Sequence, residues 1–415
     1  MRPARRTLRH AARVLSEMLE FSGPADELLS RYFRAEHSLG RKERGFIAEA
    51  AFAVLRRRRS LEAAAGSAAP EALVVAAAMR VLGLSLRSLE GLVDPALAER
   101  IRSFRSDALP PAVRADLPDW LWERLVADHG EREAERIAQG LLNPAPLDLR
   151  VNLARAGREE VHARFARDGI EAQETPYSPA GLRLAGKPAI NRHALFRDGL
   201  VEVQDEGSQV LAWLLAPRRG EMVADYCAGA GGKTLALAML MRGTGRVYAL
   251  DVSARRLAAL GPRAARAGVT NVHTIALSGD NDPRAKRLAG KLDRVLVDAP
   301  CSGFGTLRRN PDLKWRHGER AISELAEKQR GILATAARLV KPGGRLVYAT
   351  CSILSAENEA VAESFTAAQP EFAAVSCDEL LAAQRIALRT GPRLRLWPHL
   401  HRTDGFFAAV FARRA

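Results

Sequence analysis

The stretch that decides the fold is Asp225-Tyr-Cys-Ala-Gly-Ala-Gly-Gly-Lys-Thr234. It follows a short apolar segment typical of a strand and precedes a run of leucines and alanines typical of a helix. A glycine-rich turn between a strand and a helix leaves backbone N–H groups free to face a ligand. From about residue 220 onward strand and helix patterns alternate, and further strands are predicted at 272–277, 293–298, 345–350 and 406–411. Such alternation predicts an α/β domain with a doubly wound, parallel sheet.

Three kinds of ligand use such a turn. A Walker A phosphate loop needs glycine where this chain has Cys227, and a dinucleotide fingerprint needs a third glycine where it has Thr234. An adenosine-type cofactor without a pyrophosphate remains, and S-adenosylmethionine is the commonest such cofactor on this architecture. The turn therefore predicts S-adenosylmethionine as the cofactor.

Two aspartates follow the next strands along the chain. Asp251 ends the strand after the turn, where a carboxylate can accept both hydroxyl groups of a ribose. Asp280 follows the third strand, where it can recognise an adenine amino group. An aspartate in such a place is more often a helix cap. Doubly wound sheets bind ligands at the carboxyl ends of their strands, however, so the joint placement of the two favours cofactor binding.

Two cysteines follow the fourth and fifth strands, in the motifs Asp298-Ala-Pro-Cys301 and Thr350-Cys351-Ser352. Both thiols should therefore converge on the cofactor cleft. A methyl donor flanked by thiols suggests a carbon acceptor, because thiolate addition at carbon 6 of a pyrimidine makes carbon 5 nucleophilic. Cysteine is otherwise commonly a small buried hydrophobe. We therefore expect Cys377 to be such a buried side chain. We expect the same of the sulfur of Cys227, because the glycine turn uses the backbone of that residue more than its side chain.

Composition restricts the classes of protein and partner. The 415 residues predict two or three domains, and 47% hydrophobic residues argue against wholesale disorder. The formal net charge of +15 favours a nucleic acid partner. Only four cysteines occur, none in a CxxC pair, so we expect neither a bound metal nor a disulfide framework. We find no pattern of a secretory signal or a membrane span, and expect a cytoplasmic protein that is a monomer by default.

The chain divides into three predicted parts. Residues 1–140 read as an all-α region, 145–208 as a small α+β module, and 209–415 as the catalytic domain. In the first part the run Arg56 to Arg59 fits a solvated helix end as well as an RNA contact. In the third part residues 308–315 combine three cations with a tryptophan, and we expect this loop to grip phosphate and stack a base.

The motifs together resemble the NOL1/NOP2/sun family of RNA cytosine-C5 methyltransferases. The resemblance rests on DYCAGAGGKT, DAPCSGFGTLRRNPDLKW, KPGGRLVYATCSI and DGFFAAVF, and it extends from about Leu117 to the C-terminus. The bacterial branch that acts on small-subunit ribosomal RNA, the RsmB type, is the most similar. The all-α region resembles the NusB-like RNA-binding domain of that branch only loosely. The resemblance implies a class I, Rossmann-like methyltransferase domain that uses S-adenosylmethionine.

The resemblance also assigns roles to residues. It makes Cys351 the nucleophile, Cys301 the residue that assists departure of the enzyme, and Asp298 the group that hydrogen-bonds or protonates the base near N3. We expect Lys233 to help generate the thiolate, with a helix-end residue pointing to solvent as the alternative. The implied cofactor-binding residues are Cys227, Ala228, Gly229, Ala230, Gly231, Gly232, Lys233, Asp251, Arg256, Asp280 and Asp298.

Two other functions stay open. A transfer RNA cytosine-C5 methyltransferase would use the same catalytic residues. A non-catalytic RNA-binding factor in ribosome assembly would keep the fold without turnover, although the intact Cys301, Cys351 and Asp298 argue against it.

Overall fold

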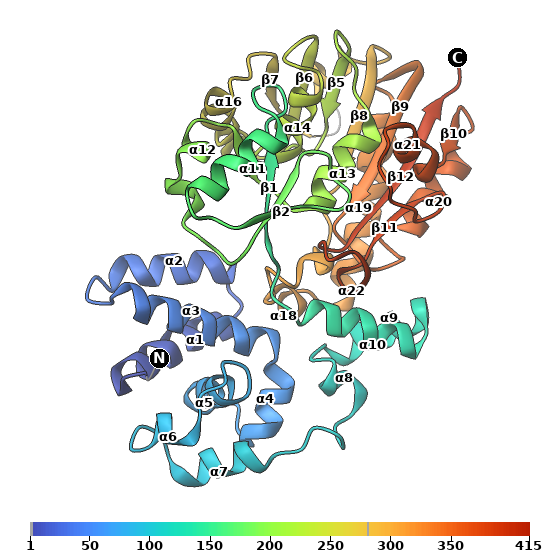
Figure 1. The fold of residues 1–415 in the computed structure, drawn as a ribbon. Helices are drawn as coiled ribbons and strands as arrows, with labels where there is room; N and C mark the ends of the chain where they lie inside the picture. Colours follow the sequence, from blue (N-terminus) through green and yellow to red (C-terminus); the bar gives the residue numbers. More distant parts are fainter. Residues whose placement is uncertain (1–2, 280–281) are drawn as a thin grey trace. The chain divides into compact units, whose positions relative to one another are not determined.

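The computed structural model describes residues 3–279 and 282–415 and divides the chain into two compact units. A helical unit comprises Met1–Pro144 together with Thr306–Glu319. A second, α/β unit comprises Ala145–Gly305 and Arg320–Ala415, and it carries both the small module and the catalytic domain (Figure 1). The helical unit thus includes a segment that the sequence places inside the catalytic domain.

The helical unit is built from amphipathic helices around a core of leucine, alanine and valine side chains. Helix α5 is the most deeply covered of these, since Ala72 to Ala78 are all buried in a run without a polar residue. Prolines begin α5, α7 and α8, where their missing N–H costs nothing. The helices are α1 (Arg5–Leu19), α2 (Ala25–Ala35), α3 (Arg41–Arg56), α4 (Arg58–Ala65), α5 (Pro70–Arg80), α6 (Leu86–Leu89), α7 (Pro95–Ser103), α8 (Pro111–Arg114), α9 (Asp119–His129), α10 (Glu131–Leu141) and α18 (Leu313–Arg316).

The segment that contains α18 is anchored by its polar side chains. Lys314 is 2% exposed, and its Nζ donates to the carbonyl oxygens of Arg56 and Asp116 at 2.8 and 2.5 Å. The indole N–H of Trp315 donates to the carbonyl oxygen of Leu55 at 2.8 Å, and Arg308 is also buried. The expectation that this loop grips phosphate is therefore wrong for Arg308 and Lys314, because both cations are buried within the helical unit.

The basic run at 56–59 makes contacts of the same kind. Arg56 donates to the carbonyl oxygen of Arg308 at 3.1 Å, and Arg58 pairs with Glu62 at 2.7 Å. Arg59 pairs with Asp119 at 2.6 Å. These three arginines are thus bonded to neighbouring groups of the protein, which favours a structural role over an RNA contact.

The small module, at the start of the α/β unit, is a four-stranded antiparallel sheet with one longer helix. Its strands lie in the order β2-β3-β1-β4, and Leu149, Val151 and Leu182 pack against Phe165 of the helix. The elements are β1 (Leu147–Val151), α11 (Arg158–Arg167), β2 (Ala172–Glu174), β3 (Gly181–Leu184), η1 (Ile190–Arg192), α12 (Ala194–Arg197) and β4 (Val201–Val203).

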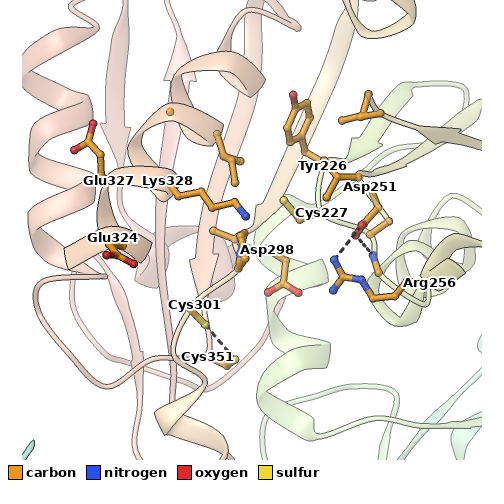
Figure 2. A pocket seen from close by; sticks show the side chains of 18 of the residues that line it. Tyr226, Cys227, Asp251, Arg256, Asp298, Cys301, Glu324, Glu327, Lys328 and Cys351 are labelled. Atoms are coloured by element: carbon orange, nitrogen blue, oxygen red, sulfur yellow. Dashed lines mark hydrogen bonds and ion pairs between the residues drawn. The ribbon is translucent and has the colours of Figure 1, made fainter. Parts of the chain in front are cut away.

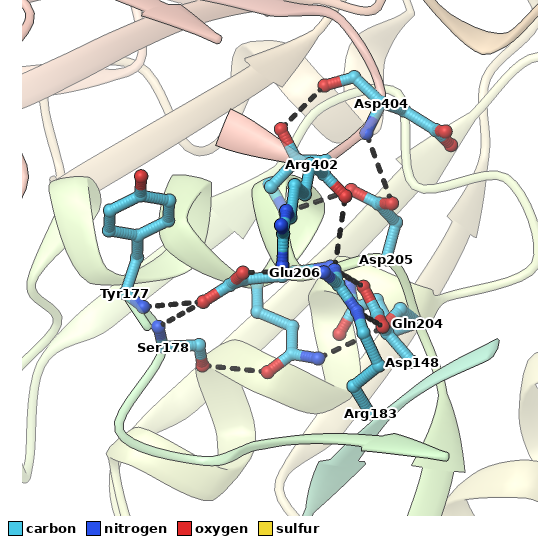
Figure 3. A network of polar contacts seen from close by, with 12 residues as sticks. Asp148, Tyr177, Ser178, Arg183, Gln204, Asp205, Glu206, Arg402 and Asp404 are labelled. Carbon is cyan, nitrogen blue, oxygen red and sulfur yellow. Dashed lines mark hydrogen bonds and ion pairs between the residues drawn. The ribbon is translucent and has the colours of Figure 1, made fainter. Parts of the chain in front are cut away.

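A buried polar network connects this module to the helix that follows it, α13 (Glu206–Leu215) (Figure 3). Asp148 accepts two hydrogen bonds from Arg183 at 2.7 and 2.8 Å and a third from the backbone N–H of Glu206 at 3.2 Å. Glu206, which is fully buried, accepts from the backbone N–H groups of Tyr177 and Ser178 at 2.5 and 2.9 Å. A buried network with this many partners fixes the module in one orientation on α13.

Among the described residues the catalytic domain has an eight-stranded sheet in the order β10-β12-β9-β8-β5-β6-β7, with β11 paired to β12. Neighbours from β9 to β7 are parallel, and β10, β11 and β12 are antiparallel additions. The chain runs outward through β5, β6 and β7 and then returns to place β8 on the other side of β5. The crevice at the carboxyl ends of β5 and β8 is the switch point at which such sheets bind ligands.

Both faces of this sheet are covered. Along β9, Leu346 and Tyr348 belong to one apolar cluster and Val347 and Ala349 to another, as alternation along a doubly covered strand requires. The strands are β5 (Met222–Asp225), β6 (Arg246–Asp251), β7 (Val272–Ala276), β8 (Leu292–Asp298), β9 (Val340–Thr350), β10 (Phe372–Val375), β11 (Leu394–Leu396) and β12 (Phe406–Arg413). The helices after α13 are α14 (Gly232–Leu240), α15 (Ala254–Ala258), α16 (Leu260–Ala267), α17 (Pro283–Lys286), η2 (Phe304–Thr306), α19 (Glu319–Ala337), α20 (Glu359–Ala368), α21 (Cys377–Ala383) and α22 (Pro398–His401).

Within residues 3–279 and 282–415, no single helix combines the length and apolar character needed to cross a membrane. The pair α4 and α5 meets that test only when the two are taken together, and they bend by 101° at their junction.

Candidate active site

A cavity of about 1010 Å³ opens at the carboxyl ends of β5, β6, β8 and β9 (Figure 2). A volume of this size is typical of sites that hold a cofactor. Nine of the predicted site residues line it: Cys227, Ala228, Gly229, Ala230, Asp251, Arg256, Asp298, Cys301 and Cys351.

The glycine turn forms one wall of the cavity. Its backbone folds back on itself, since the N–H of Gly231 donates to the carbonyl of Ala228 at 2.8 Å, just before α14 begins at Gly232. Gly231 has φ +83°, and a Cβ added there would lie 2.2 Å from Cδ1 of Leu260. Only glycine fits this position, for reasons of both backbone conformation and space.

Asp251, at the end of β6, is 2% exposed and holds the turn in place. One carboxylate oxygen accepts from the backbone N–H of Gly229 at 2.8 Å, and the other accepts from that of Ser253 at 2.7 Å. Arg256 reaches the second oxygen at 3.0 Å. A carboxylate offers about four acceptor positions, so Asp251 keeps capacity for a ribose hydroxyl. Asp280, the predicted adenine partner, lies outside the described residues.

Lys233 and Asp298 form an ion pair with an Nζ–Oδ2 distance of 2.7 Å. Burial alone would lower the pKa of Lys233, but the charge of Asp298 and the hydrogen bond to it raise that pKa above its ordinary value. A negative charge on Cys351 would raise it further. Lys233 therefore stays protonated, and it faces Asp298 rather than solvent, with 12% of its side chain exposed.

The two thiols meet at the edge of the cavity. The sulfur atoms of Cys301 and Cys351 lie 3.4 Å apart, and both residues line the cavity (Figure 2). The hydrogen bond to Cys351 and burial raise the pKa of the Cys301 thiol well above its usual range. Cys301 thus remains a protonated thiol beside the Cys351 sulfur. The third cysteine on the cavity, Cys227, also has a raised pKa, because it is buried.

Comparison with known proteins identifies the family. The model of the 16S rRNA methyltransferase RsmB/F family matches residues 212–412, and that of its ferredoxin-like domain matches 117–191. A Bacillus subtilis protein named probable ribosomal RNA small subunit methyltransferase B is 35% identical over 77% of this chain and 72% of its own. A Synechocystis protein of the same name is 37% identical over 70% of this chain and 66% of its own. The crystal structure of PH0851 covers 99% of both chains with a TM-score of 0.81 and 27% identity.

The chain belongs to the RsmB/F methyltransferase family.

Family membership confirms several expectations. The chain is an S-adenosylmethionine-dependent RNA methyltransferase of the NOL1/NOP2/sun group, with the class I fold that the motifs predict. The cavity fits this cofactor, because a buried carboxylate lies at one end and two thiols at the other.

The sequence reasoning missed one wall of the RsmB/F cavity. Ser323, Glu324, Glu327 and Lys328 of α19 line it, and Figure 2 shows Lys328 extending from that helix into the cavity. These residues follow no strand end and belong to none of the motifs quoted above. Their helical spacing alone gave no sign that one face of α19 meets the cofactor cleft.

Proposed function

We propose that this enzyme transfers a methyl group to carbon 5 of cytosine in small-subunit ribosomal RNA, through a covalent bond between Cys351 and carbon 6. The names of the Bacillus subtilis and Synechocystis relatives support the RNA target. The observation that carries the chemistry is the 3.4 Å separation of two sulfurs in one cavity that also contains Asp251.

In the first step the sulfur of Cys351 bonds to carbon 6, and the proton of its thiol passes to Asp298, which with it hydrogen-bonds or protonates the base near N3. Each action favours the other, because a proton or hydrogen bond at N3 withdraws electrons from carbon 6. The positive charge of Lys233 orients Asp298 and stabilises a thiolate at Cys351. Carbon 5 thereby becomes the nucleophile. S-adenosylmethionine, when bound, supplies the methyl group on its sulfonium sulfur.

The second step releases the enzyme. Carbon 5 then carries both the methyl group and its original hydrogen, so that proton must leave as the bond between carbon 6 and sulfur breaks. We assign assistance in this departure to Cys301: its protonated thiol, 3.4 Å from the Cys351 sulfur, gives its proton to that sulfur as it leaves, and the Cys301 thiolate formed in this way accepts the proton from carbon 5.

The remaining assignments are part of this proposal. The backbone of Cys227 to Lys233, with Asp251 and Arg256, binds the cofactor, and Asp280 recognises its adenine. The module at 145–208 and the helical region before it position RNA. We expect the enzyme to act in the cytoplasm as a monomer.

The test is methyl transfer from labelled S-adenosylmethionine to purified 16S ribosomal RNA and, separately, to transfer RNA. Bisulfite sequencing of the 16S product should place the new 5-methylcytosine at a single position. Label in transfer RNA alone would favour the alternative substrate. Absence of label from both, with the Cys351→Ala protein as the blank, would contradict catalysis.

A further inference from the structure

Glu357 lies between the two cysteine motifs and is fully buried. Its Oε1 accepts from the backbone N–H of Ser302 at 2.8 Å and from Nε2 of Gln329 at 3.0 Å. Its Oε2 accepts from the hydroxyl groups of Ser302 and Ser352, each at 2.5 Å. One carboxylate therefore joins the residue that follows Cys301 to the residue that follows Cys351.

The hydrogen bonds of Glu357 lie just beyond the end of the strand pairing that joins the two motifs. The pairing of β8 with β9 ends at Asp298 and Ala349, and both cysteines come after it. Beyond that point the backbone N–H of Gly305 donates to the carbonyl of Cys351 at 2.8 Å, the hydroxyl oxygens of Ser302 and Ser352 lie 3.2 Å apart, and Glu357 bonds to both of these serines. The distance between the sulfurs thus depends on loops that Glu357 ties to each other.

The carboxylate itself is held rigidly. Gln329, which is fully buried, also donates to the carbonyl of Pro300 at 3.0 Å and accepts from the hydroxyl of Tyr348 at 3.1 Å. Asn358, the next residue, accepts from the hydroxyl of Thr350 at 2.5 Å and donates to the carbonyl of Ser352 at 3.1 Å. The residues on both sides of Cys351, Thr350 and Ser352, are therefore hydrogen-bonded to the segment that carries Glu357.

We propose that Glu357 is a positioning residue that holds the Cys301 and Cys351 sulfurs within reach of one substrate base. Four donors converge on its two oxygens, and a carboxylate can accept at both. Glutamine could keep these contacts, because its NH2 group can donate to the two serine hydroxyls, whereas leucine has a similar size and no hydrogen-bonding group, so Glu357→Leu removes all four. The reacting groups of an active site need support of this kind, because small displacements cost large factors in rate.

The geometry can be tested without RNA by using phenylarsine oxide. This trivalent arsenical binds two neighbouring thiols at once, forming two arsenic–sulfur bonds and releasing one water, and it binds a single thiol only weakly. The wild-type chain should bind one equivalent, detected as a mass increase and quantified by competition with a free dithiol. Cys301→Ser and Cys351→Ser should both lose this binding, which identifies the site.

We expect Glu357→Leu to bind phenylarsine oxide at least about tenfold more weakly than wild type, and Ser352→Ala, which removes one contact, to show a smaller decrease in the same direction. Glu206→Leu is the matched control, because Glu206 is an equally buried glutamate that accepts from two backbone N–H groups elsewhere in the α/β unit (Figure 3). It should bind the arsenical like wild type. Equal affinity for Glu357→Leu and Glu206→Leu would overturn the proposal.

The kinetic consequence rests on the proposed function and is measured separately. In single-turnover methylation, Glu357→Leu should lower the rate at least about tenfold while leaving the dissociation constant of S-adenosylhomocysteine within about twofold. An unchanged rate would also overturn the positioning role. If wild type itself methylates no RNA while the arsenical result holds, the proposed function fails and the geometric inference stands.

Discussion

The carboxylate of Asp251 already has three donors before any cofactor arrives. Two are backbone N–H groups, of Gly229 and Ser253, and the third is the guanidinium of Arg256, whose side chain is 59% exposed. Accepting both hydroxyls of a ribose would exceed the four positions a carboxylate offers. Arg256 is the donor that can move most easily, because more than half of its side chain is exposed, whereas the other two donors belong to the backbone.

Replacing Asp251 by asparagine should weaken cofactor binding. The amide loses the negative charge and turns one acceptor into a donor, and a hydrogen bond to a charged group contributes about 1.5–3 kcal/mol. We expect the dissociation constant of S-adenosylhomocysteine, measured by calorimetry, to rise about tenfold or more. Asp293→Asn is the matched control, because Asp293 accepts from the backbone N–H of Met222 at 2.8 Å near the amino end of β8. An equal effect of both variants would contradict a specific role for Asp251.

Individual site residues were predictable where a strand ends. Asp251, Asp298, Cys301 and Cys351 could be placed together because the carboxyl ends of parallel strands share one edge of a sheet. Glu357 could not, since no spacing rule links a glutamate six residues after a cysteine to a serine on another loop. The pairing of Lys233 with Asp298 was also beyond the sequence, which left open whether that lysine faced solvent.

At the scale of elements, α18 shows how a motif can be misread. Residues 308–315 have the composition of a nucleic acid contact, three cations and an aromatic ring. In the fold, Lys314 is buried against two backbone carbonyls and Trp315 is bonded to a third. Composition cannot distinguish a cation that faces solvent from one that anchors a segment, because the outcome depends on which helix packs over it.

The burial of Lys314 predicts a pH dependence. Burial lowers its pKa to about 7, partly offset by Asp116, whereas an unfolded lysine has a pKa of about 10.4. Between pH 7 and 9 the unfolded chain therefore binds a proton that the folded chain lacks, and stability should rise with pH, by up to about 1.4 kcal/mol per pH unit. Lys314→Met should lose this rise. Denaturation followed by tryptophan fluorescence at several pH values measures it, and parallel pH profiles for both proteins would contradict the assignment.

At the scale of the molecule, the order of strands and helices in the catalytic domain was predictable from alternation and from the glycine turn. The four strands predicted at 272–277, 293–298, 345–350 and 406–411 correspond to β7, β8, β9 and β12. The grouping of Thr306–Glu319 with the helical unit was not predictable. A segment that leaves one unit to join another carries no mark in its local sequence, since the partners it meets are some 200 to 300 residues away.

The net charge of +15 predicts how RNA binding responds to salt. Each phosphate neutralised by lysine or arginine releases counterions, with a slope of about −0.7 per contact in a plot of log affinity against log salt for single strands. Three or more contacts should lower the affinity for 16S ribosomal RNA at least about tenfold between 50 and 200 mM salt. Filter binding measures this dependence, and an affinity that does not change with salt would contradict RNA binding driven by charge.

The account depends most on the order in which the two thiols act. The Cys301→Ala protein, incubated with S-adenosylmethionine and its RNA, should accumulate an RNA–protein adduct that survives denaturing electrophoresis, because release is impaired after Cys351 has attacked. The Cys351→Ala protein and the double variant should form none. An adduct in Cys351→Ala, or methylation by that variant at the wild-type rate, would contradict the assignment of Cys351 as the nucleophile.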